Sequence, residues 1–339
     1  GSTSESIATS WPSDGLRPLW KVATPTGFSS FAVGNGRVFT KISRTIQGIP
    51  REVCIALDAE TGKELWAQPV GFAKYGHDGG NAGSPDNNGG DGPRSTPTVD
   101  GDRVYVMSSD LTLFCFNAAD GKTVWSRDLV KEHAGRNITW KNAASPLVDG
   151  DLIFVAGGGP GQALLGIRKT DGSVAWKAEN DMMTHATPTA ATILGQRQVI
   201  FFTQEGLVSV HPGNGKVLWR YKFPFRTSTA ASPVVCEDIV YCSAGYGVGA
   251  GAVKISRDGD RFTATELWRK PNQLINHWST PVYKDGYLYG MFSFKQWDRG
   301  PIKCVEVATG KEMWEQPGFG PGNVILVNGN ILALGDRGQ

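Results

Sequence analysis

The sequence predicts an all-β protein assembled from repeated four-stranded antiparallel units, and two interleaved repeats support this prediction. The first repeat is an eleven-residue stretch, clearest at 56–66 (ALDAETGKELW), in which apolar alternation leads into a glycine turn and a final Trp. Further copies lie at 115–125, 166–176, 209–219 and 304–314. A sixth copy ends at Trp268, where residues 256–265 lengthen the turn. Repetition of this kind indicates an array of equivalent structural units.

Each copy has the composition of a β-hairpin. A Thr-Gly, Asp-Gly or Asn-Gly pair supplies the turn, because Gly accepts a positive φ and the residue before it can hydrogen-bond its own backbone. The strand after the turn ends in Trp at the same place each time, so these side chains should fill one recurring slot between neighbouring units. The expected slot residues are Trp20, Trp66, Trp125, Trp176, Trp219, Trp268 and Trp314.

The second repeat is a hairpin that precedes the first, as in 95–106 (STPTVDGDRVYV). Its relatives lie at 29–40, 144–155, 186–202, 231–242, 279–290 and 322–334. One hairpin of each kind gives a four-stranded antiparallel unit of about 45 to 60 residues, near the period of β-propeller blades. The sequence therefore predicts a β-propeller.

The two ends of the chain set the expected number of blades. Residues 16–22 (LRPLWKV) resemble a final blade strand with Trp20 in the Trp position, whereas residues 322–339 supply only a first hairpin. We expect the N-terminal strand to close the last blade, which gives seven blades in a single domain at 16–339. An eighth blade is the alternative if the natural chain continues. We expect residues 1–15 to be a tag and linker, and any signal peptide or lipid anchor of the natural protein to have been removed from this sequence.

The composition argues against several classes of function. A net charge of +2 without a Lys/Arg block gives no indication of nucleic-acid binding. There is no apolar run of about 20 residues, so no membrane-spanning segment is expected. Among the five cysteines, Cys115 and Cys304 share the repeat position of Ala56, which indicates small buried residues rather than metal ligands. A Cys236–Cys242 disulfide is disfavoured, and we expect a monomer.

One long loop, residues 71–94, is rich in Gly, Asn and Asp. Loops of this length are either functional or disordered. Side-chain oxygens for a calcium ion could come from Asp78, Asn81, Asp86, Asn87, Asn88 and Asp91. Their spacing matches no defined calcium loop, so we favour a flexible surface loop and predict no metal site.

Residues just before the first strand of each blade lie at the mouth of the central channel in a propeller. Here these segments are polar or aromatic and differ between blades, whereas the Trp and Gly positions are nearly uniform. Ligand sites combine a few convergent polar groups with aromatic walls, so these segments are the candidate binding site. The alternative is that they only fill and solvate the channel. The candidates are Arg94, Trp140, Lys141, Asn142, His185, Arg226, Ser228, Asn276, His277 and Trp278.

The form Ala-x-Asp-x-x-Thr-Gly-x-x-x-Trp at 56–66 resembles the tryptophan-docking repeat of the pyrroloquinoline quinone (PQQ) quinoprotein family. The resemblance covers most of the chain, from Leu16 to Gly335. That family includes quinoprotein alcohol dehydrogenases and non-catalytic relatives such as the outer-membrane assembly lipoprotein BamB. The resemblance therefore implies an exported or periplasmic protein of the bacterial cell envelope.

The chain departs from the dehydrogenases that it resembles. It has no adjacent cysteines, no Cys-x-x-Cys-His haem site and no Asp in the candidate mouth segments at 140–142, 185, 226–228 and 276–278. Because fold does not fix function, we favour a non-catalytic propeller without a cofactor. It would bind a protein, peptide or glycan at the channel mouth or at blade edges, as a scaffold.

The alternative is a small oxidoreductase that uses PQQ with calcium. In that case Arg94, Lys141 and Arg226 would hold the quinone carboxylates. One of the two candidate Trp residues would stack on the quinone ring. One of the two candidate His residues would act as general base.

Overall fold

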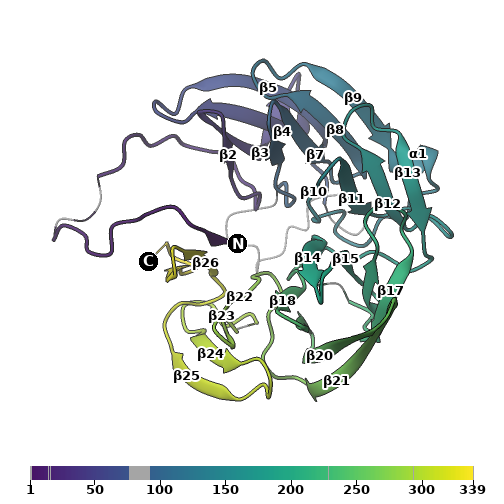
Figure 1. Ribbon diagram of the computed structural model, residues 1–339. Coiled ribbons are helices and arrows are strands. Elements are labelled where there is room, and N and C mark those ends of the chain that lie inside the picture. The colour runs from purple at the N-terminus through teal and green to yellow at the C-terminus, as the bar shows by residue number, and fades with distance from the viewer. Residues whose placement is uncertain are drawn as a thin grey trace. The chain divides into compact units, whose positions relative to one another are not determined.

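The computed structural model describes residues 2–13, 15, 17–75, 92–227, 229–292 and 294–338. Apart from one short helix, α1 (Leu129–Glu132), the regular elements of these ranges are β-strands. The strands form six four-stranded antiparallel sheets and one three-stranded sheet within these ranges (Figure 1). The six candidate calcium ligands between residues 78 and 91 lie outside the described residues.

The chain divides into two compact units, which we describe separately. The N-terminal unit comprises residues 17–183 and 212–215, and the C-terminal unit comprises the rest of the chain. The N-terminal unit holds three sheets, each made of four strands in sequence order. These strands are β2 (Ala32–Gly34), β3 (Arg37–Ile46), β4 (Ile49–Asp58) and β5 (Glu64–Phe72); β6 (Thr98–Asp100), β7 (Arg103–Met107), β8 (Thr112–Asn117) and β9 (Thr123–Asp128); and β10 (Leu147–Asp149), β11 (Leu152–Ala156), β12 (Leu164–Arg168) and β13 (Val174–Ala178).

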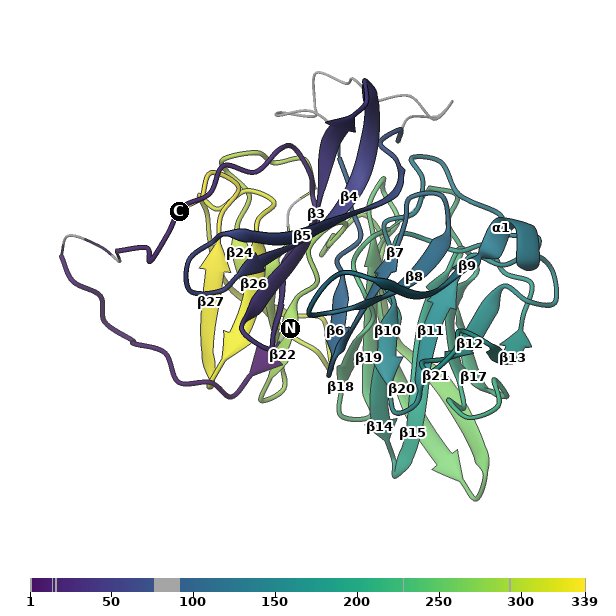
Figure 2. The same cartoon turned by 90° about the horizontal axis from the view of Figure 1, so that it is seen from above.

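The C-terminal unit holds three further four-stranded sheets and the three-stranded one. The four-stranded sheets contain β14 (Thr189–Ile193), β15 (Gln196–Thr203), β16 (Gly206–Val210) and β17 (Val217–Lys222); β18 (Val234–Cys236), β19 (Ile239–Ala244), β20 (Gly249–Asp258) and β21 (Arg261–Lys270); and β22 (Val282–Lys284), β23 (Tyr287–Met291), β24 (Ile302–Glu306) and β25 (Glu312–Gln316). The last sheet contains β26 (Asn323–Val327), β27 (Asn330–Leu334) and β1 (Ser2–Thr3). Figure 2 shows β26 and β27 beside the sheet of β24, and β26 adjoins β22 and β23.

The turn between the third and fourth strands follows the chemistry that the motif predicts. In the first copy the Asp58 carboxylate accepts hydrogen bonds from the Thr61 amide at 2.9 Å and the Thr61 hydroxyl at 2.7 Å. These hydrogen bonds hold the pKa of Asp58 below its ordinary value. Gly62 completes the turn with φ +71°. The Asp, Thr and Gly of the motif therefore act together to fix one tight turn.

The Trp that ends each copy pairs across the sheet with a small residue of the third strand. The pairs are Ala56–Trp66, Cys115–Trp125, Gly166–Trp176, Ser209–Trp219, Ala252–Trp268 and Cys304–Trp314. At Gly166 a Cβ atom would lie 2.4 Å from the Trp176 ring, so the indole itself demands a small partner. All five cysteines are buried and free. The burial of Cys115 and Cys304 is the one that their repeat position predicts.

Five of the Trp indoles dock in the same way onto the turn of the following copy. The Nε1–H groups of Trp20, Trp66, Trp125, Trp176 and Trp268 donate to the backbone carbonyls of Ala59, Ala118, Lys169, Pro212 and Val307 at 2.6–3.0 Å. Each accepting carbonyl lies three residues before the turn glycine. A Cβ at any of these glycines would lie 2.5–2.9 Å from the indole. The glycine thus serves both the positive φ of the turn and the close approach of the ring.

Two Trp residues depart from this arrangement. Trp219 is buried, but its indole donates to Gln198 Oε1 at 2.7 Å, because the next copy has a long hairpin in place of the tight turn. Trp314 is 47% exposed. Its ring packs on Tyr289 of its own sheet, as the Trp125 ring packs on Tyr105. The expected slot around Trp314 is open because, within the described residues, no strand other than β26 pairs with β27, and so no glycine turn between a third and a fourth strand is present.

The N-terminal strand that joins the last sheet differs from the expected one. It is β1, which pairs in parallel with β26. The described part of 16–22 forms no strand, although Trp20 does dock onto the turn at Gly62. An N-terminal strand thus joins the last sheet as expected, but it is β1 and not the expected strand at 16–22. In the other sheets the fourth strand pairs with the third strand in chain order. The last sheet contains no strand in that third position within the described chain, so residues 16–22 have no edge to pair with.

Replacing Trp125 with Ala should lower the free energy of unfolding by roughly 3–5 kcal/mol, because it removes a buried ring and the donor to the Lys169 carbonyl. Urea-induced unfolding followed by circular dichroism measures the change. Trp314→Ala is the matched control, and its open slot should limit the loss to about half of that value or less. Equal losses in both variants would mean that docking onto the next sheet contributes little stability.

Candidate functional site

The candidate residues of the N-terminal unit are held by contacts within that unit. The Arg94 guanidinium donates to the Trp140 carbonyl at 2.8 Å and lies 4.8 Å over the Tyr75 ring. Lys141 forms an ion pair with Asp110 at 3.0 Å. Trp140 and Lys141 both have positive φ, near +65°, so their backbone forms a turn that few non-glycine residues adopt. Arg94 and Trp140 are thus brought together through a backbone contact.

Asn142 is a structural residue in this arrangement. Its side-chain amide is buried and donates to the carbonyls of Ser108 and Ala144, and its side-chain oxygen accepts from the Ala144 amide. Both polar atoms of the Asn142 side chain are therefore hydrogen-bonded to backbone groups. A buried side-chain amide needs hydrogen-bond partners, and here the backbone of the surrounding loop supplies them. Asn142 is therefore polar because it holds this loop in place.

Asn276 has the same role in the C-terminal unit. It is fully buried, donates to the Met291 carbonyl at 2.9 Å and accepts from the Tyr241 hydroxyl at 2.7 Å. Its backbone amide donates to Ser243 Oγ at 2.9 Å. The residue connects neighbouring sheets through these bonds. Ser228, another candidate, lies outside the described residues.

His277 lies in an aromatic surround in the C-terminal unit. It is only 8% exposed, and three rings approach it nearly edge-on, those of Tyr246, Trp278 and Phe294 at 5.0–5.3 Å between centroids. Its Nδ1 accepts from the Gly245 amide at 3.1 Å, which places the proton of the neutral ring on Nε2. Burial lowers the pKa of His277 to about 4, with smaller effects from the charges of His185 and Lys295.

Three residues of this cluster were not among the sequence candidates. Tyr246, Phe294 and Trp297 lie in loops after β19 and β23, outside both repeats. Trp297 stacks on Trp278 with centroids 5.8 Å apart, and Phe294 contacts both Trp278 and Tyr246. We call Tyr246, Trp278, Phe294 and Trp297 the aromatic platform. The aromatic-rich run at 292–297 was the sequence signal that could have indicated it.

Arg226 and His185 also belong to the C-terminal unit. Arg226 lines a shallow pocket of about 440 Å³ with Gln204, Glu205 and the Pro224–Phe225 segment. His185 acts on His277 through its charge. The residues that the oxidoreductase hypothesis assigns to the quinone thus fall in both units. In the part of the chain that the structure describes, no group of three or more His, Cys, Asp or Glu residues could hold a metal ion.

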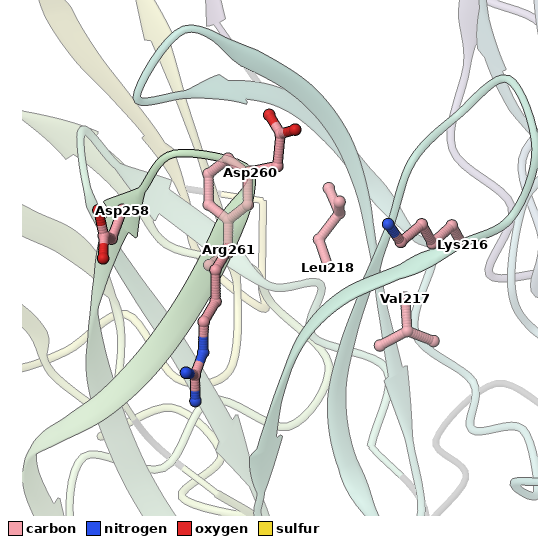
Figure 3. Close-up of a pocket in the computed structure, with 7 residues that line it drawn as sticks. Lys216, Val217, Leu218, Asp258, Asp260 and Arg261 are labelled. Carbon is pink, nitrogen blue, oxygen red and sulfur yellow. The ribbon is translucent and has the colours of Figure 1, made fainter.

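A second feature of the C-terminal unit lies at the outer edges of two sheets, and we call it the blade-edge pocket (Figure 3). It arises from the lengthened turn of the sixth copy, which lets β20 and β21 run for 10 residues each, past the end of β17 with its 6 residues. The pocket has a volume of about 500 Å³. Its lining consists of Lys216, Val217, Leu218, Asp258, Asp260, Arg261 and Phe262.

The blade-edge pocket combines an apolar wall with charges of both signs. Phe262 is nearly buried, with the Arg257 guanidinium 5.1 Å over its ring, whereas the Asp260 carboxylate is fully exposed at the hairpin tip. Val217 and Leu218 supply apolar surface from the opposite side. Sequence reasoning noticed the long turn but assigned it no role. An apolar floor with a charged rim is typical of a polypeptide-binding surface.

Comparison with known proteins identifies the fold of this chain. The chain is 23% identical over 332 residues to outer membrane protein assembly factor BamB of Yersinia pestis, covering 80% of this chain and 78% of that protein. The structure of BamB from Moraxella catarrhalis matches with a TM-score of 0.63 at 17% identity, covering 92% of this chain and 80% of that one. A europium-containing methanol dehydrogenase gives 0.56 at 16% identity, covering 91% and 71%. The fold is a β-propeller of PQQ-like repeats, and the seven sheets are its blades.

The family itself follows from a match over most of the chain. The family model described as outer membrane protein assembly factor BamB matches residues 50–316. The chain belongs to this family. Within the described residues there is no helix with the length and apolarity needed to span a membrane.

The buried state of His277 predicts a pH dependence of stability. Its pKa is about 4 in the folded protein against an ordinary value of 6.5, so the unfolded chain binds the proton more readily. The associated stability is present above about pH 6.5 and is lost as the pH falls towards 4, by up to about 3 kcal/mol. Urea unfolding at several pH values should show this slope, and His277→Gln should flatten it. A His277 ring that titrates near 6.5 by NMR would contradict the prediction.

Proposed function

We propose that this protein is a non-catalytic binding and scaffold module that takes a polypeptide partner at the blade-edge pocket. The observation that carries the proposal is the pocket itself. Its apolar wall at Val217, Leu218 and Phe262 offers burial, and its rim offers both cations and carboxylates for orientation. Such a surface on two adjacent outer strands suits an extended or loop segment of another protein.

The engagement of the candidate mouth residues supports a binding function over a catalytic one. Arg94 and Lys141 bond to groups of their own unit, and the side chains of Asn142 and Asn276 are buried in backbone contacts. His277, with a pKa of about 4, is a poor general base at neutral pH. These residues serve the architecture in the arrangement described.

The cell envelope is the proposed location. The relatives are named outer membrane protein assembly factors, and the chain belongs to their family. By this resemblance we infer an exported, periplasmic protein that acts in the bacterial envelope as a BamB-like scaffold. A protein partner is favoured over a glycan because the pocket lies along strand edges and carries an apolar wall.

Charge reversal at the hairpin tip tests the blade-edge pocket. A photo-cross-linking amino acid at position 216 should capture one predominant envelope protein in cells of the source organism. Asp258→Lys combined with Asp260→Lys should reduce this product about tenfold or more, because the rim would repel the partner's cations. Glu60→Lys with Asp285→Lys is the control, since it adds the same charge on exposed turns elsewhere. Equal capture by both double variants would contradict the proposal.

The PQQ-dependent oxidoreductase is the competing function, and calorimetry separates the two. Titration of the protein with PQQ in the presence of calcium should give no binding up to about millimolar quinone, because Arg94 and Lys141 are engaged within their own unit. Micromolar binding that is lost in an Arg94→Ala/Arg226→Ala double variant would favour the oxidoreductase. Oxidation of alcohols or sugars with PQQ and a dye acceptor would establish it.

A further inference from the structure

The side chains of the aromatic platform are much more exposed than the docked Trp side chains of the blades. Tyr246 is 46% exposed, Trp278 41% and Trp297 40%, whereas a docked Trp such as Trp125 is 9% exposed. The exposed rings are contiguous, since Trp297 stacks on Trp278 at 23° between planes and Phe294 bridges to Tyr246 at 4.9 Å. A contiguous exposed aromatic surface on a soluble fold marks a recognition site.

The platform is built from three separate segments around a fixed centre. Gly245 lies so close to His277 that a Cβ there would stand 2.7 Å from Nδ1. The His277 carbonyl accepts from the amides of Ala230 and Ala231 at 2.8 and 3.0 Å, which fixes its backbone. The rings around it therefore rest on a rigid support. Preorganisation of this kind lowers the entropy lost when a ligand binds.

Most hydrogen-bonding groups of the platform and of His277 at its centre can only donate, and the Tyr246 hydroxyl can donate or accept. Within the described chain the indole N–H groups of Trp278 and Trp297 and the Tyr246 hydroxyl bond to no protein group, and neither does Nε2 of the buried His277. An indole N–H can only donate, and so can Nε2–H in the tautomer that Gly245 imposes. A ligand that brings carbonyl oxygens would replace water as the acceptor for these donors.

The charged groups nearby strengthen the same preference. Lys295 lies 5.7 Å over the Tyr246 ring and 5.8 Å over the Phe294 ring, which places a positive charge beside the platform. The carboxylate of Asp298, next to Trp297, is engaged by Arg337. A sugar would bring hydroxyl donors that find few acceptors here. A ligand rich in carbonyl acceptors and poor in donors fits the surface better.

We propose that the aromatic platform binds a proline-rich segment of a partner polypeptide in the polyproline II conformation. Proline has no backbone N–H, and this conformation leaves its carbonyls free to accept from the platform donors. Pyrrolidine rings pack against aromatic side chains, and the preformed helix loses little entropy on docking. The inference rests on the proposed binding function, but it uses residues separate from the blade-edge pocket, so each test can fail without the other.

Decaproline labelled with fluorescein is the probe, and fluorescence anisotropy with the full chain is the measurement. Trp297→Ala should weaken binding by about tenfold or more, because it removes an exposed ring and a donor. Trp297→Phe should weaken it only a few-fold, since the ring remains and the N–H is lost. Trp314→Ala is the matched control, an equally exposed Trp of the same unit, and should leave binding unchanged.

The outcomes separate the proposed ligand from others. Circular dichroism verifies that each variant is folded, and a glycine–serine peptide of equal length should not compete, because it has no preformed conformation. If cellohexaose displaced the labelled probe and unlabelled decaproline did not, the platform would be assigned to glycans and the proposal overturned. So would unchanged binding to Trp297→Ala, equal weakening in Trp314→Ala, or no binding to the wild-type chain.

Discussion

The contact between a Trp of one sheet and the glycine turn of the next is the interaction on which the rest of the structure depends. An isolated four-stranded sheet of this size cannot bury both of its faces, so each sheet needs its neighbour. The indole meets this need in three ways, since it fills apolar space, donates to a carbonyl and excludes any side chain at the glycine. Where this contact is replaced, as at Trp219, a long hairpin covers the ring, and the same change of turn creates the blade-edge pocket.

Most of the fold could be predicted from the sequence because the repeat encodes a local structure and an inter-sheet contact at once. The strand pairing, the small residue opposite each Trp and the burial of Cys115 and Cys304 follow from the repeat position. The ends of the chain could not be predicted in this way. Strand pairing by Ser2–Thr3 leaves no pattern in two residues, and Trp20 docks without a strand of its own. Lys41 was equally unpredictable, for it is buried against Glu52 at 3.2 Å.

The candidate sites could be predicted from the sequence less well than the fold. Segments before each first strand are distinctive, yet in Asn142 and Asn276 that distinctiveness reflects buried hydrogen bonds between loops and sheets. Polar residues with a structural role and polar residues with a ligand have the same appearance in a single sequence. Tyr246 and Trp297 belong to loops without repeat partners, and only the fold brings them beside Trp278. The long turn at Asp258–Arg261 was visible, but its consequence for an outer edge required the neighbouring strand β17.

The acceptor in each docked Trp contact is a backbone carbonyl, and this has a consequence for divergence. Every amino acid carries that oxygen, so the docking position accepts Ala, Lys, Pro or Val without loss of the hydrogen bond. Among the five docked copies in this chain, the indole and the glycine are constant and the acceptor residue varies. Proteins built in this way can exchange most of their side chains while the architecture persists, which accounts for relatives that share a propeller at about one identical residue in five.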